Sequence, residues 1–259
     1  MPPAVPLNVR ALSGMAEFEA CSAIEREVWG DEVVPPHLFR AITHMGGIAV
    51  GAFAGSELVG FVFGFLGSME REGRQQLLHH SHVLAVLPAW RGRGLGSRLK
   101  RRQADLCRER GLQLMTWTFD PLRARNAHLN IERLGVVARH YEPHYYGVMQ
   151  DSQNAHLDSD RLLAEWELTA EPARWDGKAD ALPVVLDELS DGGPSEPELG
   201  LEARAVHLKI PADLDAVLGS SPELARRWRE AVRETFLHYL ERRYTATRFL
   251  DGGYVLSRA

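Results

Sequence analysis

The sequence has few cysteines, no long apolar run and no excess of positive charge, and each of these absences excludes a class of protein. Cys21 and Cys107 are the two cysteines, and both lie in helix-like apolar patterns. They are predicted to be small core residues rather than disulfide partners or metal ligands, which fits a reducing cytoplasm. No apolar stretch approaches membrane-spanning length, and the N-terminus lacks the basic and then apolar pattern of a secretory signal. We therefore expect a cytoplasmic protein with no membrane partner.

The charge balance and the histidine spacing exclude two further classes of site. A net charge of -5 argues against a general nucleic-acid binder, because phosphate contacts need a basic surface. The eleven histidines are scattered without the spacing of a metal site, so no metal is expected. The composition is that of an ordinary globular protein, and 259 residues can form a sizeable core.

The most informative stretch is residues 80–97, where a strand, a glycine-rich turn and a helix are expected to follow one another. The apolar run Val83–Leu87 indicates a strand that ends at Pro88, and the helical pattern opens at about Gly94. Glycines let the backbone approach an anion, and free N–H groups at the start of a helix point toward it. The stretch therefore predicts a phosphate-binding loop.

The spacing within this loop narrows the kind of phosphate ligand. A dinucleotide fingerprint fails because its third glycine position falls on Ser97, and no P-loop run is present. What is present is Arg91-x-x-Gly94-x-Gly96 directly after a strand, with a plain connector as the alternative interpretation. This pattern resembles the pyrophosphate loop of the GNAT superfamily of acyl-CoA N-acyltransferases.

The order of the predicted elements is typical of a layered α/β domain. Periodicity and turn signals predict strands over residues 7–12, 48–54, 58–66, 83–87, 112–119 and 136–140, and helices after residue 14, after Pro35 and over residues 94–110 and 126–134. Residues 69–77 are polar and are predicted to form a loop. The order resembles the GNAT fold over residues 7–170, which implies a mixed, twisted central sheet flanked by helices.

The remainder of the chain is predicted to form a C-terminal appendage. Residues 171–203 are rich in Pro, Gly, Asp and Glu and indicate a linker or surface loop. Residues 204–259 form an α+β extension, with a long helix over about 221–243 and a hairpin around Asp251-Gly252-Gly253. Its apolar helix face should pack either on the GNAT core or on a second subunit. In the second case the protein would be a homodimer.

The GNAT resemblance implies acetyl-CoA or another acyl-CoA as co-substrate. Pantetheine would lie where two strands splay apart and would pair with the backbone of residues 84–86. The implied coenzyme A residues are Leu84, Ala85, Val86, Arg91, Gly92, Arg93, Gly94, Leu95, Gly96, Ser97 and Asn126. Asn126 has helix capping as its alternative role. Arg98, Lys100, Arg101, Arg102 and Arg108 share the polar face of the helix, which either is solvated or contacts the ribose phosphate.

Acyl transfer to an amine needs a neutral nucleophile and a proton for the departing thiolate. His80 and His82 share one face of the predicted strand, and histidine accepts protons near neutral pH. The run resembles a strand of arylalkylamine N-acetyltransferases, which implies a proton relay; the alternative is that both rings merely line a pocket. The tyrosine that often protonates the thiolate in GNAT enzymes is replaced by Ile131. Tyr141 is the candidate substitute, with Tyr145, Tyr146, His128 or solvent as alternatives.

For the acceptor, the sequence favours a small-molecule amine such as an amino acid, because no long charged run offers a docking surface for a protein tail. Asp120 is expected to hold its ammonium at the end of a strand, although an Asp before Pro is also a common turn starter. Trp29 lies in a loop region that could close over the acceptor. We expect direct attack in a ternary complex, with acetyl or, as a second option, succinyl transfer. The alternatives are an inactive acyl-CoA-binding sensor and a protein lysine or N-terminal acetyltransferase.

Overall fold

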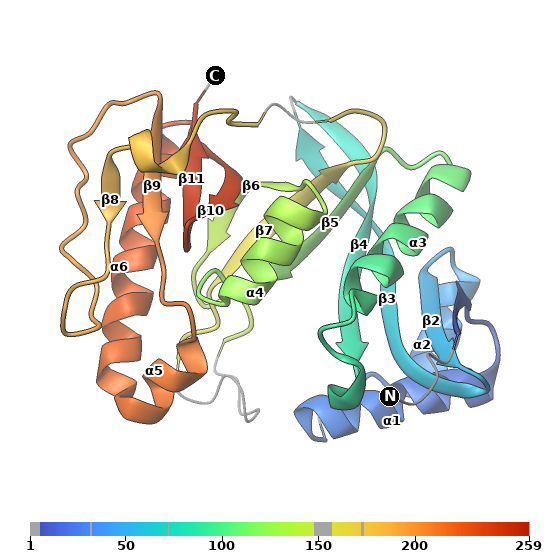
Figure 1. The fold of residues 1–259 in the computed structure, drawn as a ribbon. Coiled ribbons are helices and arrows are strands. Elements are labelled where there is room, and N and C mark those ends of the chain that lie inside the picture. The colour runs from blue at the N-terminus through green and yellow to red at the C-terminus, as the bar shows by residue number, and fades with distance from the viewer. Residues whose placement is uncertain (1–5, 32, 72, 148–156, 172–173, 259) are drawn as a thin grey trace. The chain divides into compact units, whose positions relative to one another are not determined.

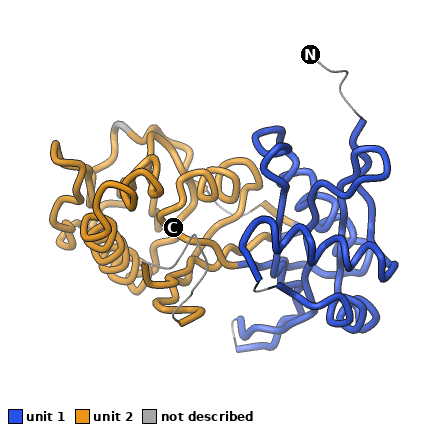
Figure 2. Tube along the Cα trace, turned by 90° about the horizontal axis from the view of Figure 1, so that it is seen from below, with its two compact units in different colours: residues 1–117, 151–153, 167–169 blue, residues 118–150, 154–166, 170–259 orange. Residues whose placement is uncertain are grey.

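The computed structural model describes residues 6–31, 33–71, 73–147, 157–171 and 174–258, and the chain forms two compact units (Figures 1 and 2). Unit 1 comprises residues 1–117, 151–153 and 167–169, and unit 2 comprises residues 118–150, 154–166 and 170–259. Both contain strands and helices, so the predicted mixed α/β class is confirmed. No helix within the described ranges is long and apolar enough to cross a bilayer.

Unit 1 is a sheet with helices packed against it. Its elements are β1 (Leu7–Ala11), α1 (Met15–Trp29), α2 (Pro36–His44), β2 (Ile48–Ala54), β3 (Glu57–Arg71), β4 (Arg74–Val86), η1 (Pro88–Trp90), α3 (Leu95–Glu109) and β5 (Leu114–Phe119), the last of which runs on into unit 2. The strands lie in the order β1-β2-β3-β4-β5. Neighbours pair antiparallel up to β4, and β4 pairs parallel with β5.

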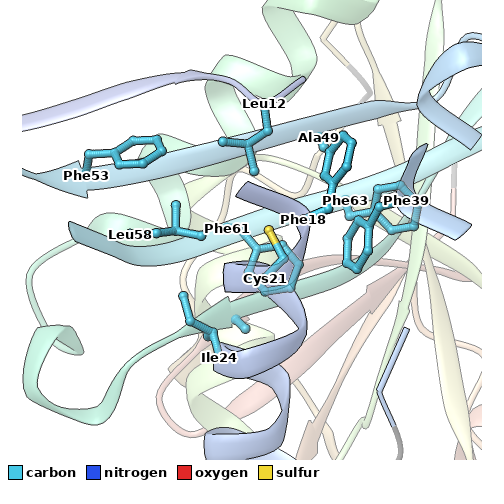
Figure 3. Close-up of a cluster of buried hydrophobic side chains, with 11 residues drawn as sticks. Leu12, Phe18, Cys21, Ile24, Phe39, Ala49, Phe53, Leu58, Phe61 and Phe63 are labelled. Atoms are coloured by element: carbon cyan, nitrogen blue, oxygen red, sulfur yellow. The ribbon is translucent and has the colours of Figure 1, made fainter. Parts of the chain in front are cut away.

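The apolar core of unit 1 lies between the sheet and the first two helices (Figure 3). The predicted stripe of α1 contributes Phe18 and Cys21, both fully buried. From α2, Phe39 stacks on Phe18 with ring centroids 5.8 Å apart and contacts Phe63 of β3 at 4.3 Å. Cys21 is therefore a free, buried core residue, as predicted, and so is Cys107.

The polar stretch 69–77 is not the loop that the sequence predicts. It belongs to a long β3–β4 hairpin whose pairing continues from Ser68↔Leu77 to Arg71↔Arg74. Backbone pairing satisfies the N–H and C=O groups of a strand whatever its side chains are, so a solvated hairpin arm needs no apolar pattern. The prediction was wrong because it relied on that pattern.

Unit 2 contains a second set of strands and a long helix. Its elements are α4 (Ala124–Ala127), a π-helical turn η2 (His128–Arg133), β6 (Val137–Glu142), β7 (Arg161–Glu167), η3 (Ala179–Ala181), β8 (Val184–Leu186), β9 (Ala205–Lys209), α5 (Leu214–Ser220), α6 (Pro222–Glu241), β10 (Thr245–Leu250) and β11 (Gly253–Ser257). The sequence did not predict β7, β8 or α5. The strands lie in the order β7-β6-β10-β11-β9-β8.

The C-terminal strands continue the sheet that contains β6. Ala246 of β10 pairs with Ala138 of β6, and the predicted hairpin of β10 and β11 is present. Trp228 and Phe236 of α6 are fully buried, as their helical spacing predicts. The division of the chain at residues 170 and 204 stays a prediction.

Candidate active site

The glycine-rich turn after β4 has the backbone that an anion-binding loop requires. Gly92 and Gly94 have φ angles of 76° and 72°, in the left-handed region that favours glycine. Gly94 is the N-cap of α3, whose first turn contains no acidic residue and has no side chain capping it. The first N–H groups of α3 and its dipole are therefore available to an anion.

Two arginines of this turn are held by local contacts. The Nε of Arg91 donates to the carbonyl oxygen of Val86 at 3.0 Å, which ties the turn back to the end of β4. The guanidinium of Arg93 lies 4.8 Å from the ring centroid of Trp90. Both arginines are exposed, so the turn presents positive charge to solvent.

The parallel ladder between β4 and β5 is very short. It consists of two pairs, His79↔Met115 and His80↔Thr116, although β4 continues to Val86. Residues 84–86 pair with β3 on their other side. Beyond His80, the backbone groups on this edge of β4 are therefore not paired with β5. We call the region where the two strands diverge, which begins at His80 and Thr116, the fork.

A β-bulge lies in β4 at the start of the fork. Phe63 pairs with Val83 while its neighbour Gly64 pairs with Ser81, so His82 is the extra residue. The ring of Phe65 lies 5.3 Å from that of His80 and 5.8 Å from that of His82. Both imidazoles therefore gather around one aromatic side chain, next to the fork.

The environment of His80 keeps its imidazole neutral. Its Nδ1 lies 3.1 Å from the Thr116 hydroxyl, across the last pair of the ladder. Burial lowers the pKa of His80 to about 4, with smaller contributions from the charges of His82 and Lys100. Desolvation by the surrounding protein lowers the pKa of His82 as well, although His82 is an exposed residue. Both rings can accept a proton at neutral pH, and their catalytic roles stay predictions.

A buried polar cluster lies on the α3 side of β4, and the sequence analysis did not predict it. The cluster consists of His79, Ser81, Lys100, Gln103 and Trp117. Lys100 was expected on the polar face of the helix, yet its exposed fraction is 3%. The sequence does indicate that Lys100 is buried. Ala104 and Cys107, one and two turns further on, are small apolar residues on the same face of the helix.

The close approach of β3 supports this cluster. A Cβ on Gly64 would lie 2.3 Å from the His80 carbonyl oxygen and 2.5 Å from Nε2 of His79. Only glycine fits there, so the glycine inside the apolar strand is required by packing rather than merely tolerated.

Three predicted site residues belong to unit 2. Tyr141 is buried and its hydroxyl donates to Asp160 at 2.7 Å; burial first, and then the Asp160 charge, hold its pKa well above the usual value. Asp120 accepts from Arg229 at 2.8 Å on each carboxylate oxygen. Burial opposes the ionisation of Asp120, but the charge and hydrogen bonds of Arg229 outweigh it and lower the pKa. Asn126 is an exposed residue of α4.

The remaining predicted residues are also located. Trp29 is the last residue of α1 and packs against the core of unit 1. Ile131, at the position of the missing tyrosine, is fully buried. Among the described residues, ligand atoms of His144, Asp158 and Asp160 lie within 4.8 Å of one another, but Arg233 already pairs with both carboxylates. This group therefore gives no reason to propose a metal site.

Comparisons with known proteins identify the family. The family model of the acetyltransferase (GNAT) family matches residues 15–135. The N-alpha-acetyltransferase RimI of Mycobacterium tuberculosis is 31% identical over 140 residues, which are 52% of this chain and 85% of that protein.

Solved structures share the fold. NAA60 of Arabidopsis thaliana, in complex with a bisubstrate analogue, matches with a TM-score of 0.51 at 15% identity, over 62% of this chain and 99% of that one. The ribosomal-protein-S18-alanine N-acetyltransferase of Escherichia coli matches with a TM-score of 0.50 at 14% identity, over 67% and 99% of the two chains. This chain therefore belongs to the GNAT family of acetyltransferases and is an acyl-CoA-dependent N-acetyltransferase.

Proposed function

We propose that this enzyme binds acetyl-CoA along β4 and transfers the acetyl group to an α-amine. The proposed coenzyme site rests on the fork, because the fork leaves an unpaired edge of β4 that leads to the glycine-rich turn. An extended pantetheine arm can pair with such an edge as an added strand would. Residues 84–86 supply that edge, and the first turn of α3 receives the pyrophosphate.

The turn has room for this ligand. Gly92 and Gly94 are exposed, and a Cβ built on either would meet no atom within 4 Å. The exposed Arg91 and Arg93 add positive charge beside the uncapped helix start. The donor set, namely backbone N–H groups and guanidinium groups, is the one that a pyrophosphate requires.

The second part of the proposal concerns which amine accepts the acetyl group. The RimI relative is named an N-alpha-acetyltransferase, which supports the α-amine of a peptide or protein N-terminus. A free amino acid has the same α-amine and stays the second candidate, because a net charge of -5 without a long charged run offers no evident docking surface for a basic tail. Both acceptors require the same chemistry at the fork.

His80 and His82 are proposed to collect the proton that the acceptor nitrogen loses. Both imidazoles are neutral at pH 7 and lie together beside Phe65. A general base typically contributes about 10²–10⁴-fold to a rate, and a base as weak as His80 is expected near the lower end. The acceptor must also bind as free amine, since an ammonium has no lone pair.

A thiol-release assay with acetyl-CoA and succinyl-CoA tests the function. The first acceptor is a peptide with a free N-terminus and an internal lysine. The second is the same peptide with its N-terminus blocked, and the third is a set of free amino acids. Turnover with the free N-terminus alone supports the proposal, and turnover with amino acids alone selects the second candidate. Turnover confined to the blocked peptide would overturn the α-amine assignment. Full activity of the double variant His80→Ala/His82→Ala at pH 7 would remove both histidines from the mechanism.

A further inference from the structure

The buried cluster behind the fork contains a lysine with a constrained hydrogen-bond role. Lys100 Nζ lies 2.8 Å from the Ser81 hydroxyl oxygen, which is itself 2.6 Å from Oε1 of Gln103. An amide oxygen can only accept, so Ser81 donates its proton to Gln103 and accepts one from Lys100. The amide nitrogen of Gln103 then donates to Nε2 of His79 at 3.0 Å.

The position of the Lys100 nitrogen follows from the strands. Ser81 and Trp117 are the residues that directly follow the last paired residues of β4 and β5. Lys100 Nζ contacts both of them: it hydrogen-bonds to Ser81 and lies 3.8 Å from the ring centroid of Trp117. The amine therefore sits at the apex of the fork, on the α3 side of the sheet.

A purely structural role does not explain why the amine of Lys100 is buried at the apex of the fork. Lys100 is buried, and among the described residues no carboxylate pairs with it. Within the part of the chain that the structure describes, the titratable groups that interact with it electrostatically are His79 and His80 of β4 and Cys107 of its own helix. A methionine would fill similar volume without the cost of desolvating an amine.

The proposed coenzyme geometry brings the sulfur to this point. The stretch from Val86, beside the glycine-rich turn, to Ser81 at the apex lies opposite Gly60 to Gly64 of β3, because His82 is an extra residue in the bulge. Its length is therefore about 13 Å, at roughly 3.3 Å per residue of β3. An extended pantetheine arm has this length to within about the rise of one strand residue. A pyrophosphate bound at the start of α3 would therefore place the thioester sulfur near the apex.

We propose that Lys100 is the proton donor to the coenzyme A sulfur as it leaves, in place of the missing tyrosine. This inference rests on the proposed function. The bond between the acceptor nitrogen and the carbonyl carbon forms, the carbon–sulfur bond breaks, and its electron pair stays on sulfur. The Lys100 ammonium gives one proton to that sulfur and becomes a neutral amine. The proton of the acceptor nitrogen goes to His80 or to solvent, and Lys100 regains a proton from solvent before the next turnover.

The cluster makes this transfer favourable. An ordinary lysine, with a pKa of about 10.4, would retain its proton against a thiolate whose conjugate acid has a pKa of about 8.5. Burial holds the pKa of Lys100 well below the usual value, so its ammonium is a stronger acid. The face of Trp117 still stabilises the ammonium when it forms.

The first test measures the bound thiol rather than turnover. Coenzyme A and desulfo-coenzyme A are titrated into the wild type, Lys100→Met and a matched control, Lys178→Met, which changes an exposed lysine. The pH at which the bound thiol ionises, followed by the ultraviolet absorbance of the thiolate, should be the same in the wild type and the control and different in Lys100→Met, because two groups that share a proton titrate as a pair. Desulfo-coenzyme A should bind all three proteins equally.

The second test uses only the wild type and so does not depend on how a variant folds. The sequence has three lysines, Lys100, Lys178 and Lys209, so lysine-selective isotope labelling gives three side-chain signals. Coenzyme A should change the titration of Lys100, because its sulfur shares a proton with the amine, whereas desulfo-coenzyme A should not. Identical Lys100 titrations with the two ligands, or an unchanged pH of thiol ionisation in Lys100→Met, would overturn the inference while leaving the proposed function intact. Failure of both ligands to bind the wild type would instead overturn the proposed function.

Discussion

Replacing Gly94 by valine should abolish tight coenzyme binding while leaving the fold in place. Gly94 is the N-cap of α3 with a φ of 72°, and the space around its Cβ position is open. A valine there is strained by about 1–2 kcal/mol, since an L-residue disfavours this region. Its branched side chain would also fill the space that the pyrophosphate is proposed to occupy.

The loss of affinity can be estimated from the hydrogen bonds that the side chain blocks. A hydrogen bond to a charged group contributes about 1.5–3 kcal/mol, so the loss of two such bonds costs about 3 kcal/mol or more. This corresponds to a roughly 150-fold or larger increase in Kd for acetyl-CoA. Isothermal titration calorimetry measures this change directly.

The chain provides a matched control at the other end of the same helix. Gly111 has a φ of 74° and equally open space around its Cβ position, so Gly111→Val introduces the same backbone strain far from the predicted loop. Both variants should lose similar unfolding free energy in urea, but only Gly94→Val should lose affinity. Unchanged binding in Gly94→Val, or an equal loss of affinity in both variants, would refute the assignment of the pyrophosphate site.

Three further predictions address the base, the buried ion pair and the C-terminal strands. His80→Ala should lower the rate about 10²-fold at pH 7, with partial recovery at higher pH as free amine forms unaided; a pH–rate profile parallel to that of the wild type would contradict this. Asp120→Asn leaves Arg229 buried without its charge partner and should cost about 3–5 kcal/mol in urea unfolding, whereas the half-exposed Asp187→Asn should cost at most about 1 kcal/mol. Because the pKa of Asp120 is lowered in the folded state, its contribution should be present above the unfolded pKa of about 3.9 and be lost as pH falls through the folded pKa. Truncation after Gly200 removes the strands that continue the β6 sheet and should yield insoluble protein; a soluble, fully active product would show that they are dispensable.

The sequence determined the features that local rules govern. The stripe of α1, the glycine turn after β4 and the long helix α6 each follow from the spacing of residues within a few turns. Glycines at positive φ and an uncapped helix start are also local properties. The glycine-rich turn could therefore be predicted without a structure, and its role as the coenzyme loop stays a prediction.

Only the tertiary structure decided which polar groups meet. Asp120 was expected to bind the acceptor, but Arg229, 109 positions later in the chain, occupies both of its carboxylate oxygens. The burial of Lys100 depends on Ser81, which lies on a different element 19 positions earlier. No periodicity encodes such pairs, because the stability of a buried polar group depends on partners that the fold brings from distant segments. The same holds for the fork, since the point where β4 and β5 diverge is set by sheet pairing and not by the residues of either strand alone.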